Sequence, residues 1–127
     1  AGALHVLDEG EGVVPVVFLH GASGSARAWR PALEDRQATL GRTLFVDRPG
    51  HGHSERLAGR QAARLDHHAG AIIDALDHAG IGLAVLVAHS WAGALACRIA
   101  LDHGGRVAGL LLLAPATHPW PGGVHWY

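Results

Sequence analysis

The stretch LAVLVAHSWAGALA, residues 83–96, decides how this sequence folds. The apolar run over residues 83–88 has the length and composition of a buried strand, and small residues then lead into a helix-like segment. Ser90 stands at the junction, with Ala88 two residues before it and Ala92 two residues after it. Small residues at these two places suit a sharp turn from a strand into a helix, because the backbones crowd there.

Ser90 has two interpretations at this point. A serine on such a turn exposes its hydroxyl, which can attack a carbonyl when a base is within reach. The N–H groups at the start of the helix would then favour the developing negative charge. A serine is also a common N-cap, which would here open a helix at Trp91. The usual nucleophile turn carries glycine at both flanking places, and both are alanine here, so this motif alone leaves the two interpretations open.

Apolar runs alternate with helix-like stretches along the whole chain. We expect strands over residues 13–19, 43–47, 83–88 and 107–114, a short additional strand at 4–7, and helices over 26–40, 61–79 and 91–103. The main runs are apolar throughout rather than alternating, which suits strands buried on both faces. This order of elements predicts an α/β fold with a mainly parallel sheet and helices on both faces.

Composition limits the classes of function. The 127 residues are 49% hydrophobic and 17% charged, which supports a packed domain, and the net charge of -1 gives no electrostatic basis for binding nucleic acid or an anionic membrane. No apolar run approaches the roughly 20 residues of a transmembrane helix. Residues 1–10 lack a signal-peptide pattern, and the single Cys97 cannot form an internal disulfide. The compartment stays unknown, with the cytoplasm slightly favoured. The chain contains no Met, so we expect a fragment or a processed piece.

Two upstream loops bear on the interpretation of Ser90. The first, HGASGSARAW at residues 20–29, follows an expected strand and can direct a backbone N–H into a site. It lacks the lysine of a Walker phosphate loop, and its glycines do not have the G-x-G-x-x-G spacing of a dinucleotide-binding loop. The second, DRPGHGHSER at residues 47–56, comes directly after another expected strand.

Taken together, these stretches resemble the α/β-hydrolase fold family. Three match in order: a strand followed by His-Gly and small residues, a strand followed by D-x-P-G-x-G-x-S, and a strand followed by small-x-Ser-x-small-Gly and a helix. LLLLAPA at residues 110–116 is similar to the strand that follows the nucleophile helix in that family. The resemblance favours the nucleophile interpretation of Ser90. It implies that residues 1–127 are the N-terminal portion of one α/β-hydrolase domain, incomplete because the lid and the C-terminal part are absent.

The resemblance also implies roles for individual residues. Ser90 would be the nucleophile of a nucleophile elbow, and the backbone N–H groups of Trp91 and Ala22 would form the oxyanion hole. Gly93 would let the helix pack closely on the sheet, and His89 would pack beside the site. The residues of the second loop that would shape it without reacting are Asp47, Gly50, Gly52 and Ser54. The implied substrate is a small-molecule acyl compound, and no cofactor is implied.

The eleven histidines of the chain add few catalytic candidates. His51 and His53 form an H-x-H, but the Asp and His that would continue a metallo-hydrolase motif are absent, so we predict a structural loop and no metal site. We expect His20 to order its loop rather than to transfer protons. His67 and His68 are adjacent on an expected helix, and we expect both to be solvated.

The partners that a catalytic Ser90 would need are missing from this chain. In the family that the sequence resembles, the acid and the histidine of the triad follow the serine in the chain. Past Ser90 the only acid is Asp102, inside an expected helix, and His118 and His125 come before any further strand. We therefore find no triad acid or base here.

The expected strand at residues 107–114 would normally pair with a later strand. A chain that stops here leaves an open edge carrying four consecutive leucines, residues 110–113, and open apolar edges associate. We expect the isolated chain to be inactive and prone to aggregate, or to be completed by a C-terminal chain or by self-association.

Three functions stay open on the sequence. The first is a serine hydrolase that cleaves an ester or another acyl bond through Ser90. The second is a non-catalytic binding or interaction protein of the same fold, with an idle Ser90. The third is cofactor-free oxygen or halide chemistry on the same fold. Dehalogenases are disfavoured, because they use Asp where this chain has Ser90.

Overall fold

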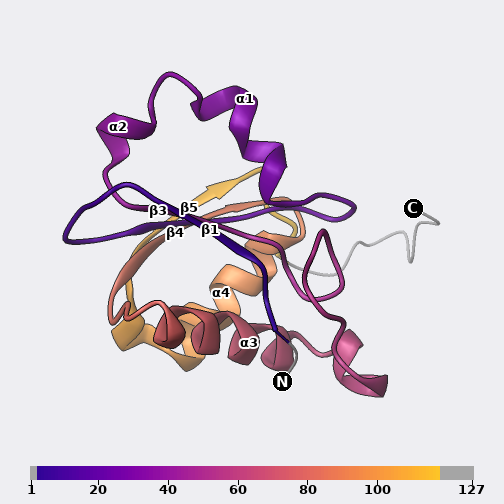
Figure 1. Ribbon diagram of the computed structural model, residues 1–127. Coiled ribbons are helices and arrows are strands. Elements are labelled where there is room, and N and C mark those ends of the chain that lie inside the picture. Colours follow the sequence, from indigo (N-terminus) through magenta and orange to yellow (C-terminus); the bar gives the residue numbers. More distant parts are fainter. Residues whose placement is uncertain (1–2, 118–127) are drawn as a thin grey trace.

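The computed structural model describes residues 3–117, which form a five-stranded sheet with helices on both faces (Figure 1). The strands are β1 (Val6–Glu9), β2 (Val16–Leu19), β3 (Thr43–Val46), β4 (Ala84–His89) and β5 (Val107–Leu113). The α-helices are α1 (Arg30–Leu33), α2 (Gln37–Leu40), α3 (Leu65–His78) and α4 (Ala92–Asp102). Three short 3-10 helices complete the list: η1 (Ala26–Trp29), η2 (Gly59–Ala63) and η3 (Gly104–Arg106).

The strand order in the sheet is β1-β3-β2-β4-β5. The last four of these run parallel to one another, whereas β1 pairs with β3 antiparallel, with Val6 opposite Val46. The prediction of a mainly parallel α/β sheet is confirmed. Because β2, β3 and β4 run in the same direction, the loops that follow them emerge at one edge of the sheet, where such folds place their ligands.

The two faces of the sheet are covered differently (Figure 1). Helices α3 and α4 lie against one face, and residues spaced four apart on each, Ile72 and Leu76 on α3 and Leu95 and Ile99 on α4, are fully buried in the main core. The other face is covered by η1 and α1 over a smaller cluster, in which Phe18 and Phe45 stack at 4.9 Å between ring centroids. Within residues 3–117, no helix has both the length and the apolar character needed to cross a membrane.

The single helix expected over residues 26–40 is wrong, because the segment is divided into η1, α1 and α2. Pro31 lies in the first turn of α1, where a helix does not need its missing N–H. A single α-helix over residues 26–40 would place Pro31 in its interior, where the missing N–H would break the helix. The apolar residues that suggested the helix, Trp29, Leu33 and Leu40, all still pack on the smaller cluster. Their spacing therefore located a buried face but not the breaks.

The central strand β2 and the edge strand β5 both bear on the sequence-based expectations. β2 begins at Val16 rather than at residue 13, because Pro15 has no N–H for the ladder and Val13 is 99% exposed. β5 pairs with β4 only, and within residues 3–117 no strand covers its other side. Leu110, Leu111 and Leu113 on this strand are 39%, 52% and 39% exposed. The open apolar edge predicted from the sequence is confirmed for the described chain.

Candidate active site

The turn at Ser90 joins β4 directly to α4 and has an unusual backbone. Ser90 has a φ of 53°, a left-handed conformation that residues other than glycine adopt at a cost. Its backbone is held from both sides. The N–H donates to the carbonyl of Leu113 at 3.0 Å, and the carbonyl accepts from the N–H groups of Gly93 at 2.9 Å and Ala116 at 3.0 Å. The N-cap position of α4 is Trp91, with no capping side chain, so Ser90 does not act as a helix cap.

The loop after β2 approaches this turn closely. A Cβ built on Gly21 would lie 3.1 Å from the Ser90 Cβ and 3.1 Å from the His89 Nδ1, so a larger residue would push the two segments apart. Ala88 and Ala92, on either side of Ser90, are fully buried. Gly93 also allows a close approach, since its Cβ would meet the Pro115 Cβ at 2.5 Å. That contact is with the segment leaving β5, whereas the resemblance implied that Gly93 lets the helix pack closely on the sheet.

Polar groups beside Ser90 are left without partners. Within residues 3–117, no hydrogen bond uses the Ser90 hydroxyl or the backbone N–H groups of Ala22 and Trp91. Ala22 is exposed and Trp91 half-buried. A half-buried N–H such as that of Trp91 is normally paired. Unpaired donors next to a strained serine can donate to a negatively charged oxygen.

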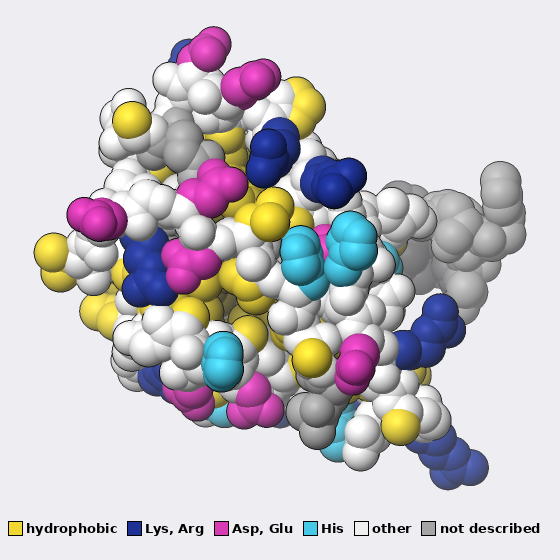
Figure 2. All heavy atoms as spheres, in the orientation of Figure 1, with side chains coloured by type: hydrophobic (Ala, Val, Ile, Leu, Met, Phe, Trp, Pro, Cys, Tyr) yellow, Lys and Arg dark blue, Asp and Glu magenta, His cyan; other side chains and the backbone are white. Residues whose placement is uncertain are grey.

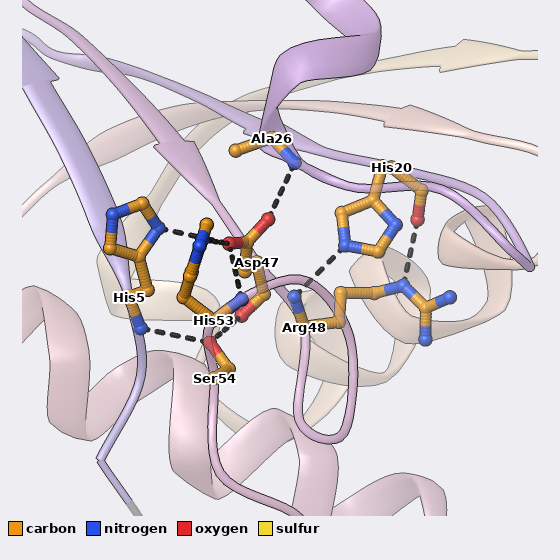
Figure 3. Close-up of polar contacts among 7 residues, drawn as sticks. All are labelled: His5, His20, Ala26, Asp47, Arg48, His53 and Ser54. Atoms are coloured by element: carbon orange, nitrogen blue, oxygen red, sulfur yellow. Dashed lines mark hydrogen bonds and ion pairs between the residues drawn. The ribbon is translucent and has the colours of Figure 1, made fainter.

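The loop after β3 is ordered around the carboxylate of Asp47 (Figure 3). Asp47 is 2% exposed; its Oδ1 accepts from the Ala26 N–H at 2.6 Å, and its Oδ2 accepts from the His53 N–H at 3.0 Å. Burial alone would raise the pKa of the Asp47 carboxyl, but the hydrogen bonds from the Ala26 and His53 N–H groups and from His5 together lower it below its ordinary value. The Ser54 hydroxyl donates to the Asp47 carbonyl at 2.5 Å and accepts from the His5 N–H at 2.8 Å. Asp47 and Ser54 thus shape the loop, as the sequence suggested.

His20 orders the loop that it opens. Its Nε2 accepts from the Arg48 N–H at 3.0 Å, which leaves the proton on Nδ1, and Nδ1 donates to the Gly21 carbonyl at 2.9 Å. Burial lowers the pKa of His20 to about 4, so the ring is neutral at pH 7. With both nitrogens bonded inside the loop, His20 fixes the backbone that approaches Ser90, in agreement with the sequence-based expectation.

Arg48 connects the two loops and was missed in the sequence. Its side chain is buried; the Nε donates to the His20 carbonyl at 2.7 Å and an Nη donates to the Gly21 carbonyl at 2.8 Å. The guanidinium carbon lies 4.3 Å from the centroid of the Trp91 ring, a cation–π contact. Burial lowers the pKa of Arg48 to about 10, which keeps it charged at neutral pH. No neighbouring residue in the sequence indicates this role, because Arg48 acts through contacts with a loop that is distant in sequence.

A hollow of about 380 Å³ opens beside this contact. Its lining includes Ala22, Arg48 and Trp91, and also His68. The expectation that His68 is solvated is wrong: its side chain is buried, its Nε2 bonds the Ala62 carbonyl at 2.9 Å and its ring meets Trp91 edge-on at 5.4 Å. His68 lies four residues before the buried Ile72 on α3, so its helical position could have indicated burial.

The described residues do not bring a triad acid to Ser90. Asp102 is the last residue of α4 and forms an ion pair with Arg98 at 2.7 Å. A helix of this length separates it from Ser90 by roughly 15 Å. His118 and His125 lie outside the described residues.

Comparison with known proteins gives one consistent family. A family model described as alpha/beta hydrolase fold matches residues 14–126. The acetyltransferase component of the acetoin cleaving system of Pseudomonas putida is 37% identical over 110 residues, and the pimeloyl-[acyl-carrier protein] methyl ester esterase of Photorhabdus laumondii is 34% identical over 117 residues. A thermophilic esterase from Thermogutta terrifontis superposes with a TM-score of 0.84 at 28% identity, over 95% of this chain. Haloalkane dehalogenases and epoxide hydrolases also occur among the relatives.

These relatives are much longer than this chain. The matched region is 84% of this chain but 28% of the Pseudomonas putida protein, and 88% of this chain but 42% of the Photorhabdus laumondii esterase. Of the Thermogutta terrifontis esterase, it covers 44%. The similarity therefore concerns less than half of each relative.

Proposed function

This chain belongs to the alpha/beta hydrolase fold family, and from that premise we propose that it carries the nucleophile half of a serine hydrolase that cleaves ester or other acyl bonds. The observation that supports this most is the strained turn at Ser90, whose φ of 53° is combined with a hydroxyl that no described residue bonds. Strain of this kind costs on the order of 1–3 kcal/mol and recurs at active sites.

In the proposed reaction, the Ser90 oxygen forms a bond to the carbonyl carbon of the substrate. The carbonyl electron pair moves to the oxygen, where the N–H groups of Ala22 and Trp91 donate to the resulting oxyanion. The hydroxyl proton passes to a base, which later returns it to the leaving alcohol as the carbonyl reforms. Water then releases the acyl group by the same steps.

Arg48 supports the oxyanion site without touching the substrate in this proposal. It binds the carbonyls of His20 and Gly21, so the two peptide units before Ala22 are held in place, and the second of these carries the Ala22 N–H. Its contact with the Trp91 ring ties the second proposed donor to the same side chain. A buried positive charge close to both donors also favours negative charge on the substrate oxygen.

The base and the acid of the triad would come from outside residues 3–117. Relatives extend well beyond the length matched by this chain, and the exposed leucines of β5 form an edge on which a further strand can pair. We propose that residues 1–127 are the N-terminal portion of one domain and that a C-terminal portion, or a second chain, completes it. Alone, the 127 residues would lack turnover and would associate through β5.

The relatives include dehalogenases and epoxide hydrolases, so the chemistry has to be distinguished by the nucleophile. This chain has Ser90 where an Asp would be expected for dehalogenase chemistry. Attack of the serine oxygen on a halide-bearing carbon would expel halide and leave an ether, which water does not readily cleave, whereas attack on an acyl carbon leaves an ester that water cleaves. The serine therefore favours acyl substrates.

Covalent labelling tests the proposal on the full-length protein. A fluorophosphonate probe, which phosphonylates activated serines, should label the protein at Ser90, and Ser90→Ala should abolish the label. Peptide mapping identifies the modified residue. No labelling of the folded full-length protein would favour a non-catalytic binding protein of this fold, and rapid ester turnover by the monomeric 127-residue chain would contradict the proposed completion.

A further inference from the structure

The side chains of His5 and His53 lie beside the Asp47 carboxylate, on the side away from His20 and Arg48 (Figure 3). His5, from the segment before β1, places its Nδ1 2.9 Å from the Asp47 Oδ2. His53, from the loop after β3, places its Nδ1 3.8 Å from the same oxygen. One donor atom from each residue lies within 4.8 Å of the other two. Two imidazoles and one carboxylate thus converge from three separate positions in the sequence.

The negative charge of the Asp47 carboxylate has no permanently positive partner among the described residues. Asp47 is buried and its pKa is lowered, so it is ionised at neutral pH, yet within residues 3–117 no arginine forms an ion pair with it. Among the described residues, the only side chains that form ion pairs with the carboxylate are His5 and His53, and each neutralises it only when protonated. A neutral imidazole has a lone pair instead, which a cation can use.

The group is also open to solvent. The side chains of His5 and His53 are 37% and 67% exposed, and their ring centroids are 5.0 Å apart. Figure 2 shows a pair of histidine side chains side by side at the surface of this face. His5 and His53 line a hollow of about 150 Å³ together with Asp47 and Gly52. Arg27 also lines it, and this exposed charge opposes a cation unless its side chain turns outward.

We propose that His5 Nδ1, His53 Nδ1 and Asp47 Oδ2 bind one divalent transition-metal ion of borderline softness, such as Zn²⁺. Two imidazole nitrogens and one carboxylate oxygen are a donor set that suits zinc, with a water in the fourth position. Zinc ligands at about 2.0–2.1 Å from the ion stand roughly 3.3–3.4 Å apart in a tetrahedron. The exposed imidazoles reach that spacing by rotating their side chains, while the buried carboxylate stays in place.

The ion would replace one hydrogen bond and keep the others. His5 moves its proton from Nδ1 to Nε2 and turns its lone pair to the metal, so no net charge is lost from the ring. The Ala26 and His53 N–H groups continue to donate to Asp47, since a carboxylate has further lone pairs. The bound ion would join the segment before β1 to the loop after β3. It would thereby stabilise the loops behind Ser90 without taking part in the chemistry at Ser90.

The combination of His5 with His53 could not be predicted from the H-x-H motif at His51 and His53. His51 turns away from His53: its Nδ1 bonds the Pro49 carbonyl at 3.0 Å and its ring lies 5.2 Å from that of His20. The second imidazole comes instead from His5, 48 residues away in sequence from His53, through the antiparallel pairing of β1 with β3. The site therefore exists only in the folded sheet.

Calorimetric titration of the metal-stripped, untagged full-length protein with Zn²⁺ tests this site. We expect one equivalent of Zn²⁺ to bind, and Mg²⁺, which prefers oxygen ligands, to bind much more weakly. His5→Ala and His53→Ala should each weaken Zn²⁺ binding at least about tenfold, since even residues behind the metal ligands have effects of that size. Zn²⁺ should raise the melting temperature of the wild type and not that of either variant.

His103→Ala provides the matched control, because His103 is a histidine at the far end of α4. It should bind Zn²⁺ with unchanged affinity. The proposal is overturned if His5→Ala and His53→Ala fold and bind Zn²⁺ as tightly as the wild type, or if His103→Ala weakens binding equally. Because binding and melting are measured without substrate, these results are independent of the role of Ser90.

Discussion

The loops that follow β3 and β4 both emerge at the carboxyl ends of the parallel strands. The polar groups of the loop after β3 are hydrogen-bonded, whereas several of those in the turn after β4 are not. In the loop after β3, the carboxylate of Asp47 accepts from three donors, and the hydroxyl of Ser54 both donates and accepts. In the turn after β4, the hydroxyl of Ser90 and the N–H of Trp91 have no partner among residues 3–117.

This difference separates residues that hold the structure from residues that are available for chemistry. Paired polar groups chiefly stabilise the loop that holds them. Unpaired groups cost stability, so a strained turn that leaves them free calls for another explanation. If the comparison is right, substitutions after β3 should change stability, and substitutions after β4 should change reactivity.

The largest expected effect is a loss of turnover, which we expect when Ser90 is replaced by alanine and not when Ser54 is. Ser90→Ala in the full-length protein should lower ester turnover by roughly 10⁴-fold or more, because the residual rate comes only from binding and the oxyanion donors. Its unfolding free energy should change by less than about 0.5 kcal/mol, since no described group loses a partner. Turnover of a chromogenic ester and urea unfolding measure the two quantities.

Ser54→Ala is the control for that experiment. It should retain turnover and lose about 1–3 kcal/mol of unfolding free energy, because the Asp47 carbonyl and the His5 N–H both lose a partner. The distinction between the two loops would be wrong if Ser54→Ala abolished turnover or Ser90→Ala unfolded the protein.

Removing the carboxylate after β3 should give the largest loss of stability. Asp47→Ala leaves the N–H groups of Ala26 and His53 without an acceptor, and we expect a loss of about 3–5 kcal/mol in unfolding free energy. Asp47→Asn keeps one acceptor oxygen and should lose less. Urea unfolding of both variants measures this, and equal stability of Asp47→Ala and wild type would show that the loop does not depend on the carboxylate.

The pH dependence of stability tests the same loops through His20. The unfolded chain binds the proton at the ordinary pKa of 6.5, whereas the folded chain resists protonation until about pH 4. The contribution of His20 to stability is therefore complete above pH 6.5 and decreases as the pH falls from 6.5 to 4, by roughly 1–3 kcal/mol in total. Asp47, whose pKa is lowered, contributes a loss only at still lower pH.

Urea unfolding at several pH values between 7 and 4 measures this slope. His20→Asn keeps a donor for the Gly21 carbonyl but does not titrate, so its stability should depend less on pH even if it is lower at pH 7. The same slope in both proteins would mean that His20 is not the group responsible.

Much of the fold was predictable because its signals are local. Buried parallel strands are apolar along their whole length, so the runs at residues 43–47 and 83–88 identified β3 and β4 within a residue or two. The segment at residues 26–40 failed because Pro31 and the polar residues after it divide one apolar face among three short pieces. Periodicity reports which side chains are buried and not whether the backbone between them is continuous.

A residue of the candidate site could be predicted from the sequence only where it lies in a short recognisable motif. Ser90, Ala22 and Asp47 each lie in a short pattern, whereas Arg48 and His5 act through partners that are distant in sequence. Nothing near Arg48 in the sequence indicates that its guanidinium binds the carbonyls of the loop after β2. Contacts between loops follow from the strand order β1-β3-β2-β4, which the sequence alone did not determine.

The smallest expected effect concerns the strain itself. A left-handed backbone costs a residue with a Cβ about 1–2 kcal/mol, and glycine does not have this cost. Ser90→Gly should remove the cost at a φ of 53°. The greater freedom of glycine in the unfolded chain should lower the unfolding free energy by roughly 0.5–1 kcal/mol. We therefore expect Ser90→Gly to be more stable than wild type by up to about 1 kcal/mol, measured by urea unfolding.

Ser54→Gly is the matched control, because Ser54 is not among the residues with a positive φ and its hydroxyl is fully engaged. It should be less stable than wild type. If Ser90→Gly lost as much stability as Ser54→Gly, the turn after β4 would be an ordinary part of the structure. A gain at Ser90 alone would mean that the chain keeps a serine where glycine would fold better, which is the expected behaviour of a residue retained for its hydroxyl.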